Sequence, residues 1–271
     1  MAITRRAVLK AFAATAAGTI VGAGSYGYFD ERRQLAISRP DVRVARLPAA
    51  LDGLRIGFLT DVHCSRWMSP EDVYRAAAQL RDERPDMIVL GGDYVTWGDR
   101  TQVHPSAEAL ASLSAPHGVY GILGNHDDDR DMPAALMAHG IIVLKDARTR
   151  LSIKGETIDL VGIRFWTKRQ ADIAPLMRGA SRTVILLAHD PRRLTEAAAL
   201  KIPLVLSGHT HGGQVVLPLV GPIAAQKFPV VAGIGTRDKT TMFVSRGIGT
   251  VYVPVRINCP PEIAVLTLRR A

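Results

Sequence analysis

The chain beyond about residue 41 alternates short apolar runs with longer stretches in which apolar and polar positions are mixed. The apolar runs are rich in Val, Ile and Leu and too short for helices, which is typical of strands buried on both faces of a sheet. They lie at 54–59, 87–90, 119–123, 183–188 and 203–206. This alternation predicts an α/β fold.

Helix signals stand between the predicted strands. Ser69 supplies an N-cap, Pro70 follows at the first helical position, and two acidic residues complete the first turn. Asp190 and Pro191 open a second stretch in the same way, and a third helix is expected at 131–139. The chain therefore has helices to place against the sheet faces.

The segment 141–163 departs from this alternation, because its apolar runs are separated only by a Lys-Gly-Glu turn, which favours a hairpin. Further strands are expected at 215–217, 242–245, 250–253 and 262–268. Together these elements predict two mixed sheets packed face to face with helices outside, a four-layer α/β/β/α sandwich. We expect residues 41–271 to form it as a single domain.

Residues 1–33 are predicted to be a targeting segment. Arg5 and Arg6 precede an Ala- and Gly-rich apolar stretch at 11–24, the order found in export signals. The paired arginines resemble the twin-arginine signal of bacteria, so we expect export by the twin-arginine machinery to the periplasm or cell envelope. A plain secretory signal, cleavage near 22–25 and retention as an N-terminal anchor remain open.

The composition is basic and poor in cysteine. The formal net charge of +9 suits an anionic substrate, a nucleic acid or an anionic membrane surface, without choosing among them. The basic residues are scattered and not interleaved with aromatic residues, so specific nucleic-acid binding is not predicted. Cys64 and Cys259 lie far apart and form no CxxC pair, which argues against a disulfide framework or a thiolate zinc site.

Five polar elements each follow directly after a predicted strand. The carboxyl ends of strands in an α/β sheet border the crevice where ligands bind, so we expect these elements to meet on one edge of the protein. Five of the eight histidines fall in them, too many for turn and capping roles alone to explain. The candidate metal ligands are Asp61, His63, Asp93, Asn125, His189, His209 and His211, with His126 and Asp127 beside Asn125.

The chemistry of these side chains indicates divalent metal ions. Imidazole, carboxylate and amide ligands without a thiolate suit manganese, iron or zinc. Within Asp61-x-His63 and His209-x-His211, alternate residues of an extended segment point the same way. Each pair can therefore face one cluster.

The order of the five elements, D-x-H, G-D, G-N-H-D, a lone H and G-H-x-H, resembles the calcineurin-like metallophosphoesterase superfamily, which has a metallo-dependent phosphatase-like fold. The segments 245–249 and 256–262 are similar to its exported bacterial YkuE/YaeI branch. The resemblance implies two divalent cations, one held by Asp61, His63 and His211, the other by Asn125, His189 and His209, and both bridged by Asp93. It also implies attack by a hydroxide that bridges the metals, with His126 as general acid and Asp127 orienting its ring.

The implied activity is hydrolysis of phosphate esters, with phosphodiester or pyrophosphate bonds preferred to monoesters. A lipid-linked or envelope-linked phosphate, a nucleotide and contact with a membrane surface all remain open. Arg66, Trp67 and Trp97 are expected to border the substrate pocket, although the tryptophans equally suit simple packing.

Three other interpretations are kept. The first is a phosphomonoesterase with the same ligands. The second is a redox metal site, which would need Tyr94 as a ligand, and the third is a non-catalytic scaffold of the same fold. A scaffold is expected to have lost ligands, and all of them are present here.

Overall fold

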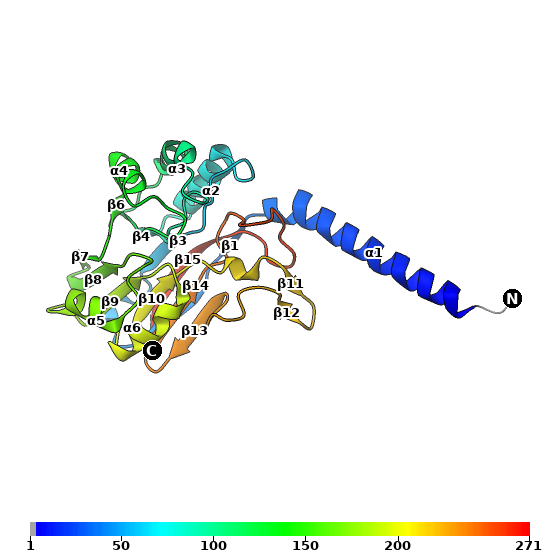
Figure 1. Cartoon of the computed structure of the whole chain (residues 1–271). Coiled ribbons are helices and arrows are strands. Elements are labelled where there is room, and N and C mark those ends of the chain that lie inside the picture. The colour runs from blue at the N-terminus through cyan, green and yellow to red at the C-terminus, as the bar shows by residue number, and fades with distance from the viewer. Residues whose placement is uncertain (1–3) are drawn as a thin grey trace.

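The computed structural model describes residues 4–271, which form a layered body from which one long helix projects (Figure 1). Two mixed sheets pack face to face, and helices cover their outer faces. The α/β/β/α arrangement expected from the sequence is confirmed. The layers matter for function because they bring the ends of strands from both sheets to one place.

The first sheet is built around a parallel centre. Its strands follow the order β1 (Ala36–Ser38), β15 (Glu262–Arg270), β3 (Arg55–Leu59), β4 (Met87–Leu90), β5 (Val119–Gly121) and β6 (Ile142–Val143), and β2 (Asp41–Val44) also pairs with β15. β3 to β6 are parallel, whereas β15 runs antiparallel to β3. The carboxyl ends of β3, β4 and β5 therefore meet at one edge.

The second sheet repeats this plan. Its order is β13 (Gly233–Arg237), β14 (Thr240–Val244), β10 (Leu204–Ser207), β9 (Thr183–Leu187), β8 (Glu156–Gly162) and β7 (Ala147–Ile153). The four central strands are parallel, and the two edge strands are antiparallel to their neighbours. β7 and β8 form the hairpin expected within 141–163. A separate small hairpin pairs β11 (Val216–Leu217) with β12 (Gly221–Pro222).

Helices cover the outer faces. The first sheet is covered by α2 (Pro70–Asp82), α3 (Val103–Leu110) and α4 (Asp131–Ala138), and the second by α5 (Gln170–Ile173) and α6 (Leu194–Ala199). Short 3-10 turns lie at Glu31–Arg33, Ala49–Leu51, Arg100–Gln102, Ala174–Met177, Pro191–Arg193 and His211–Gly213. The capping box expected at Ser69 forms, with Asp72 as its partner. The start at Pro191 gives a 3-10 turn before α6.

Three apolar cores hold the layers together, and the central strands of each sheet contribute to two of them. In β4, Ile88 and Leu90 face the helices of the first sheet, whereas Met87 and Val89 face the second sheet. The third core lies between the second sheet and its helices. Burial on both faces explains why these strands read as continuous apolar runs.

Several elements, among them β1, β2, α3 and α5, were not expected from the sequence, and two further parts of the chain differ for a clear physical reason. The run 250–253 is an exposed loop and not a strand. The Val251 N–H donates to the Gln214 side chain, at 2.6 Å from Oε1, instead of to a neighbouring strand. Tyr252 has a φ of 62°, which an extended strand does not allow. Conversely, β13 is a strand without apolar alternation, and it was not expected. Its sequence, Gly-Ile-Gly-Thr-Arg, pairs as an edge strand with β14.

Helix α1 (Arg5–Phe29) projects from the body. The segment Val8–Arg33 is long and apolar enough to cross a membrane, with a mean hydropathy of 1.3, and a signal sequence passes the same test. Only its C-terminal end contacts the body: the Arg256 N–H donates to the carbonyl of Gly27 at 3.2 Å. The helix thus extends the chain beyond the layers that carry the polar strand ends.

Candidate metal centre

The structure brings the polar strand ends together where the two sheets meet. Asp61 and His63 follow β3, Asp93 follows β4, and Asn125 and His126 follow β5 of the first sheet. His189 follows β9, and His209 and His211 follow β10 of the second sheet. Both sheets therefore contribute to a single cluster.

The first group consists of Asp61, His63 and His211, which are all buried and offer ligand atoms within 4.8 Å of one another. The Nε2 atoms of His63 and His211 are 3.1 Å apart, and Asp61 Oδ1 lies 3.4 Å from His211 Nε2. Three ligand atoms converge as they would around one cation.

The second group consists of Asp93, His189 and His209, with ligand atoms within the same 4.8 Å limit. Asp93 Oδ2 is 3.0 Å from His189 Nε2 and 3.6 Å from Nε2 of His63, a member of the first group. Asp93 therefore lies between the two groups, in the position of a shared ligand.

Hydrogen bonds to the far ring nitrogens leave Nε2 available in two of the histidines. His189 Nδ1 lies 2.7 Å from the carbonyl of Gly91, so the Nδ1–H tautomer leaves Nε2 as an acceptor. His63 Nδ1 is held in the same way by Thr96 Oγ1 at 3.2 Å. Asn125 Oδ1 is buried and has no hydrogen-bond partner in the part of the chain that the structure describes. These unfilled lone pairs fit divalent cations.

Burial sets the charge balance of the cluster. It raises the pKa of Asp61 to about 6, and it lowers the pKa of both His63 and His209 to about 4. Burial also favours neutral His189, but the carboxylates of Asp93 and Asp61 raise the pKa of His189 to about 10. The carboxylates therefore hold a proton on His189, and a divalent cation bound at this site would take the place of that proton.

The backbone at these ligands is strained. Asp61, His63, Asp93, His209 and His211 all have φ between 48° and 73°, the left-handed region that L-residues avoid. Such conformations cluster at functional sites, where the surrounding structure imposes them. They turn each side chain inward directly after its strand.

Two glycines of the polar elements are required by close packing. A Cβ on Gly124 would lie 2.0 Å from Asp93 Oδ1, and one on Gly208 would lie 2.3 Å from Asp61 Oδ2. Any side chain at either position would displace a candidate ligand.

His126 lies at the edge of the cluster, with its ring fixed by a neighbouring loop. Its Nδ1 accepts a hydrogen bond from the Trp97 N–H at 3.0 Å, which leaves the proton of the neutral ring on Nε2. Burial lowers the pKa of His126, so the neutral form is favoured. The ring centroids of His126 and Trp97 are 4.4 Å apart. His126 can therefore present an N–H to a bound group.

Asp127 does not take the expected position against the His126 ring. Among the described residues, its carboxylate accepts hydrogen bonds from four backbone N–H groups, those of Asp93 (2.8 Å), Tyr94 (2.7 Å), Val95 (3.3 Å) and Gly124 (2.8 Å). It joins the turns after β4 and β5. We therefore correct the expectation: Asp127 positions Asp93, and the Trp97 backbone orients His126.

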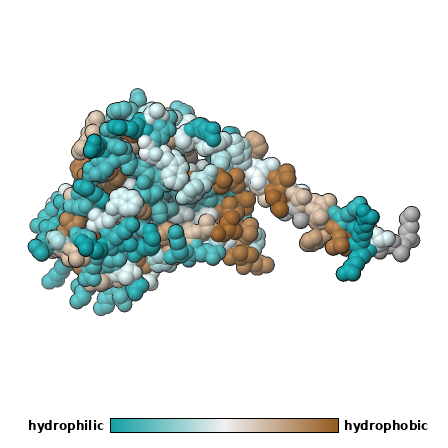
Figure 2. Space-filling view, in the orientation of Figure 1, coloured by the Kyte–Doolittle hydropathy of each residue, from teal (hydrophilic) through white to brown (hydrophobic). Residues whose placement is uncertain are grey.

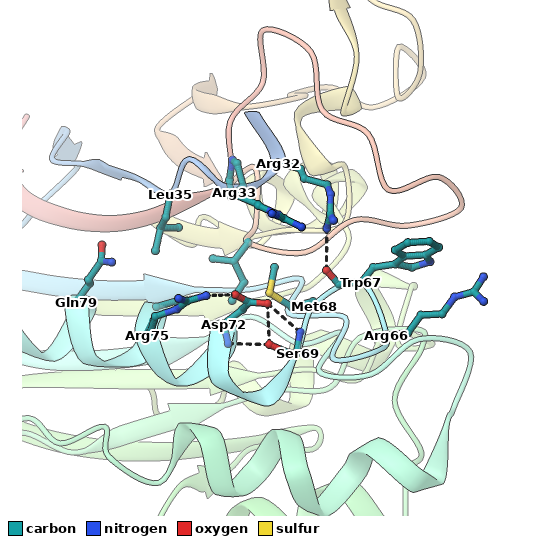
Figure 3. A pocket seen from close by; sticks show the side chains of 13 residues that line it. Arg32, Arg33, Leu35, Arg66, Trp67, Met68, Ser69, Asp72, Arg75 and Gln79 are labelled. Carbon is teal, nitrogen blue, oxygen red and sulfur yellow. Dashed lines mark hydrogen bonds and ion pairs between the residues drawn. The ribbon is translucent and has the colours of Figure 1, made fainter. Parts of the chain in front are cut away.

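The three side chains expected at the substrate pocket, those of Arg66, Trp67 and Trp97, line one cavity of about 550 Å³. Trp97 also lies beside His126, with 66% of its surface exposed. Arg66 and Trp67 line a second cavity as well, near the base of α1 (Figure 3). The cavity at the metal centre shares Tyr252 and Val253 with the first cavity, and apolar and aromatic residues of later loops, including Ile223 and Phe228, complete its lining.

Tyr94 is placed unfavourably for a redox metal. Its side chain is buried in the core beneath α2, α3 and α4, on the opposite side of the strand end from Asp93. Its hydroxyl lies against Gly121, where an added Cβ would approach it to 2.7 Å. A tyrosine ligand is therefore not supplied by this residue.

Arg256 is a buried residue that the sequence reasoning did not single out for the site. Its guanidinium donates to the carbonyls of Cys259 (3.0 Å), Arg246 (2.8 Å), Gly247 (3.0 Å) and Gly249 (2.5 Å). The loop 247–249 packs directly on Asp61, since the N–H of Gly249 donates to the Asp61 carbonyl at 2.7 Å. Arg256 thus supports the first ligand group from behind. Arg256 could have been identified from the sequence only because it begins the segment 256–262, which is similar to the exported bacterial branch.

Comparison with known proteins agrees with this geometry. The model of the family described as "Calcineurin-like phosphoesterase" matches residues 54–213. The chain is 32% identical to "Uncharacterized metallophosphoesterase YkuE" of Bacillus subtilis (strain 168), over 98% of each chain. It is 31% identical to "Phosphodiesterase YaeI" of Escherichia coli (strain K12), over 98% of this chain and 99% of that one. A dimetal phosphatase from Danio rerio aligns with a TM-score of 0.44 at 11% identity, covering 73% of this chain and 88% of that one. The chain therefore belongs to the calcineurin-like phosphoesterase family and is a metallophosphoesterase.

Proposed function

We propose that the chain hydrolyses phosphodiester or pyrophosphate bonds with two divalent cations. The observation that carries the proposal is the position of Asp93, whose Oδ2 lies 3.0 Å from a histidine of one ligand group and 3.6 Å from a histidine of the other. The first cation would be held by Asp61, His63 and His211, and the second by Asn125, His189 and His209, with Asp93 shared. Such a pair of manganese, iron or zinc ions supplies an activated water and neutralises charge on the phosphoryl oxygens.

The protein's own contribution is proton delivery and positioning. With Nδ1 held by the Trp97 N–H, His126 carries its proton on Nε2, where it donates to the leaving oxygen of the ester. Asp127 holds the turns that place Asp93 and Asn125, so it acts as a positioning residue. The relative named a phosphodiesterase favours a diester over a monoester for this site.

The proposal is tested on protein loaded with Mn²⁺, with bis(p-nitrophenyl) phosphate as diester and p-nitrophenyl phosphate as monoester. His126→Ala should lower kcat on the diester by about 10²–10⁴-fold with metal content unchanged. Asp93→Asn should lower both activity and metal content. Metal-loaded wild-type protein that hydrolyses neither ester would identify a scaffold, and a preference for the monoester would identify a phosphomonoesterase.

We also propose that the N-terminal segment directs export through the twin-arginine machinery and then anchors the protein. Arg5 and Arg6 precede an apolar helix that is long enough to remain in the membrane. Replacing both with lysine should retain the protein in the cytoplasm, as measured by fractionation, whereas the same change at Arg32 and Arg33 should not. Export of the Arg5→Lys, Arg6→Lys variant at the wild-type rate would contradict the proposal.

A further inference from the structure

The base of α1 is built into two neighbouring loops. Glu31, directly after α1, accepts hydrogen bonds from the N–H groups of Asn258 (2.9 Å) and Cys259 (2.5 Å). The same segment reaches the small hairpin, because the Val216 N–H donates to the carbonyl of Ile257 at 2.9 Å. The helix base, the loop 250–257 and the β11–β12 hairpin therefore form one connected unit.

The tips of this unit expose large apolar side chains. The exposed fractions are 66% for Val220, 56% for Ile223, 81% for Tyr252 and 54% for Val253, and Leu219 is fully exposed. Figure 2 shows the hydrophobic surface on the body beside the base of α1. Contiguous apolar surface of this kind marks a site that contacts another molecule or a membrane.

A positive charge lies beside these tips. Lys227 lines the same cavity as Ile223, Tyr252 and Val253. Apolar tips with a basic residue beside them are complementary to an anionic lipid bilayer.

A basic cavity of about 590 Å³ lies on the other side of the α1 base, where Arg32, Arg33, Arg66 and Arg75 line it (Figure 3). The acidic residue in its lining is Asp72, whose carboxylate is bound by Arg75 and by Ser69 at the start of α2. Within residues 4–271, no ion pair includes Arg33 or Arg66. The Arg33 guanidinium thus remains available for an anion, whereas the Arg66 guanidinium stacks on the Trp67 ring at the rim, 4.6 Å from the ring centroid (Figure 3).

The same cavity has an apolar floor, to which Leu35, Met68 and Ile248 contribute. Arginine donors above an apolar floor match a lipid phosphate together with the start of its acyl chains. A soluble anion would use the arginines but not the floor.

We propose that this end of the molecule docks on an anionic membrane. The apolar tips of the loops 217–223 and 252–253 enter the interface, the arginine-lined cavity takes a lipid phosphate, and α1 continues into the bilayer. A bilayer explains all three features at once, because each of them surrounds the base of a helix that is long and apolar enough to cross it.

Docking in this orientation has a consequence for the substrate, which rests on the proposed function. Ile223, Tyr252 and Val253 belong to the docking tips and also line the cavity at the metal centre. The mouth of that cavity then lies at the membrane surface. The substrate class is therefore an amphiphilic phosphodiester or pyrophosphate carried by a lipid.

Docking is tested by depth measurement on the full chain reconstituted in phosphatidylcholine vesicles with and without phosphatidylglycerol. An environment-sensitive fluorophore is attached to Leu219→Cys, with Met137→Cys on α4 as control, since Met137 is 55% exposed and lies on the far layer. Both native cysteines are buried. Brominated lipid should quench the label at position 219 at least threefold more than the label at 137. Equal quenching of the labels at positions 219 and 137 would overturn the proposal. So would protection of the label at 219 from solvent that increases with protein concentration and not with lipid, because a second copy of the chain would then cover the tips.

The arginine cavity is tested by charge reversal. Arg33→Glu with Arg66→Glu should abolish the gain in quenching that phosphatidylglycerol produces at position 219. The matched control, Arg130→Glu with Arg182→Glu, makes the same change in net charge at two exposed positions on other parts of the body. An equal loss in both variants would show that only net charge matters and would remove the cavity from the proposal.

The substrate class is tested with Leu219→Asp and Val220→Asp, which do not line the metal cavity. Hydrolysis of a phosphodiester lipid in vesicles should fall at least tenfold, while hydrolysis of soluble bis(p-nitrophenyl) phosphate should stay within twofold of wild type. Equal effects on both substrates would overturn the lipid assignment. If wild-type protein hydrolyses neither, the proposed function fails, and docking is still decided by the quenching experiment.

Discussion

Replacing the buried Arg256 by methionine should destabilise the domain by about 3–5 kcal/mol, because it leaves four backbone carbonyls without their donor, at about 1–3 kcal/mol each before the offset from removing the buried charge. The guanidinium is fully buried and donates to four backbone carbonyls. Hydrogen bonds to a charged group contribute about 1.5–3 kcal/mol each, but methionine also removes the cost of burying the charge, which offsets part of the sum. The remainder corresponds to a fall in Tm of roughly 6–20 °C for a chain of this size.

The assay is thermal unfolding followed by circular dichroism with a chelator present, so that lost metal binding does not contribute. Arg256→Lys keeps the charge but not the planar fork, and it should fall between the wild type and Arg256→Met. Because the loop 247–249 rests on Asp61, we also expect metal affinity to drop by about 10–100-fold. A fall in Tm below about 4 °C for Arg256→Met would show that the guanidinium contributes little to the stability of this loop.

Three further predictions concern the metal centre and the thiols. Adding Mn²⁺ at about 100 times its Kd should stabilise the metal-free protein by about 2.7 kcal/mol per site, seen as a rise in Tm, and an unchanged Tm with metal bound would contradict the ligand set. Gly124→Ala should lower the amount of bound metal, measured by elemental analysis, because the new Cβ would lie 2.0 Å from Asp93 Oδ1, while the circular dichroism spectrum stays native. The control is Gly18→Ala, which has open space around it and should bind metal normally. Burial raises the pKa of the Cys64 thiol to about 11, so alkylation of native protein should be slow at pH 7 and accelerate about tenfold per pH unit up to pH 9, whereas a flat pH profile would show that opening of the structure limits the reaction.

The positions of the candidate ligands could be predicted because strand ends are fixed by two simple patterns. Doubly buried strands such as β4 read as apolar runs, and the polar residue after each run must lie at the sheet edge. The pattern does not show in which direction a side chain points within the turn that follows a strand. The Asp127 carboxylate follows Asn125 and His126 in sequence, yet it faces backward into the backbone of the turns.

The residues that sequence reasoning missed act through backbone groups. Arg256 binds only carbonyls apart from a long contact of 3.9 Å with Cys259 Sγ, so no partner side chain marks it in the sequence. The loop 250–253 has the β-branched residues that are typical of a strand. Its backbone does not pair with a neighbouring strand, because the Val251 N–H donates to the side chain of Gln214. Such long-range backbone contacts carry no local signal.

The left-handed backbone of five candidate ligands has a consequence for how this family changes over time. Each of these residues is held where a side chain costs roughly 1–2 kcal/mol, so the fold carries them only as long as catalysis selects for them. A lineage released from catalysis would gain stability by accepting glycine or asparagine at these positions. We therefore expect decayed relatives to lose His209 and Asp61 to such residues first, ahead of His189, whose backbone is not left-handed.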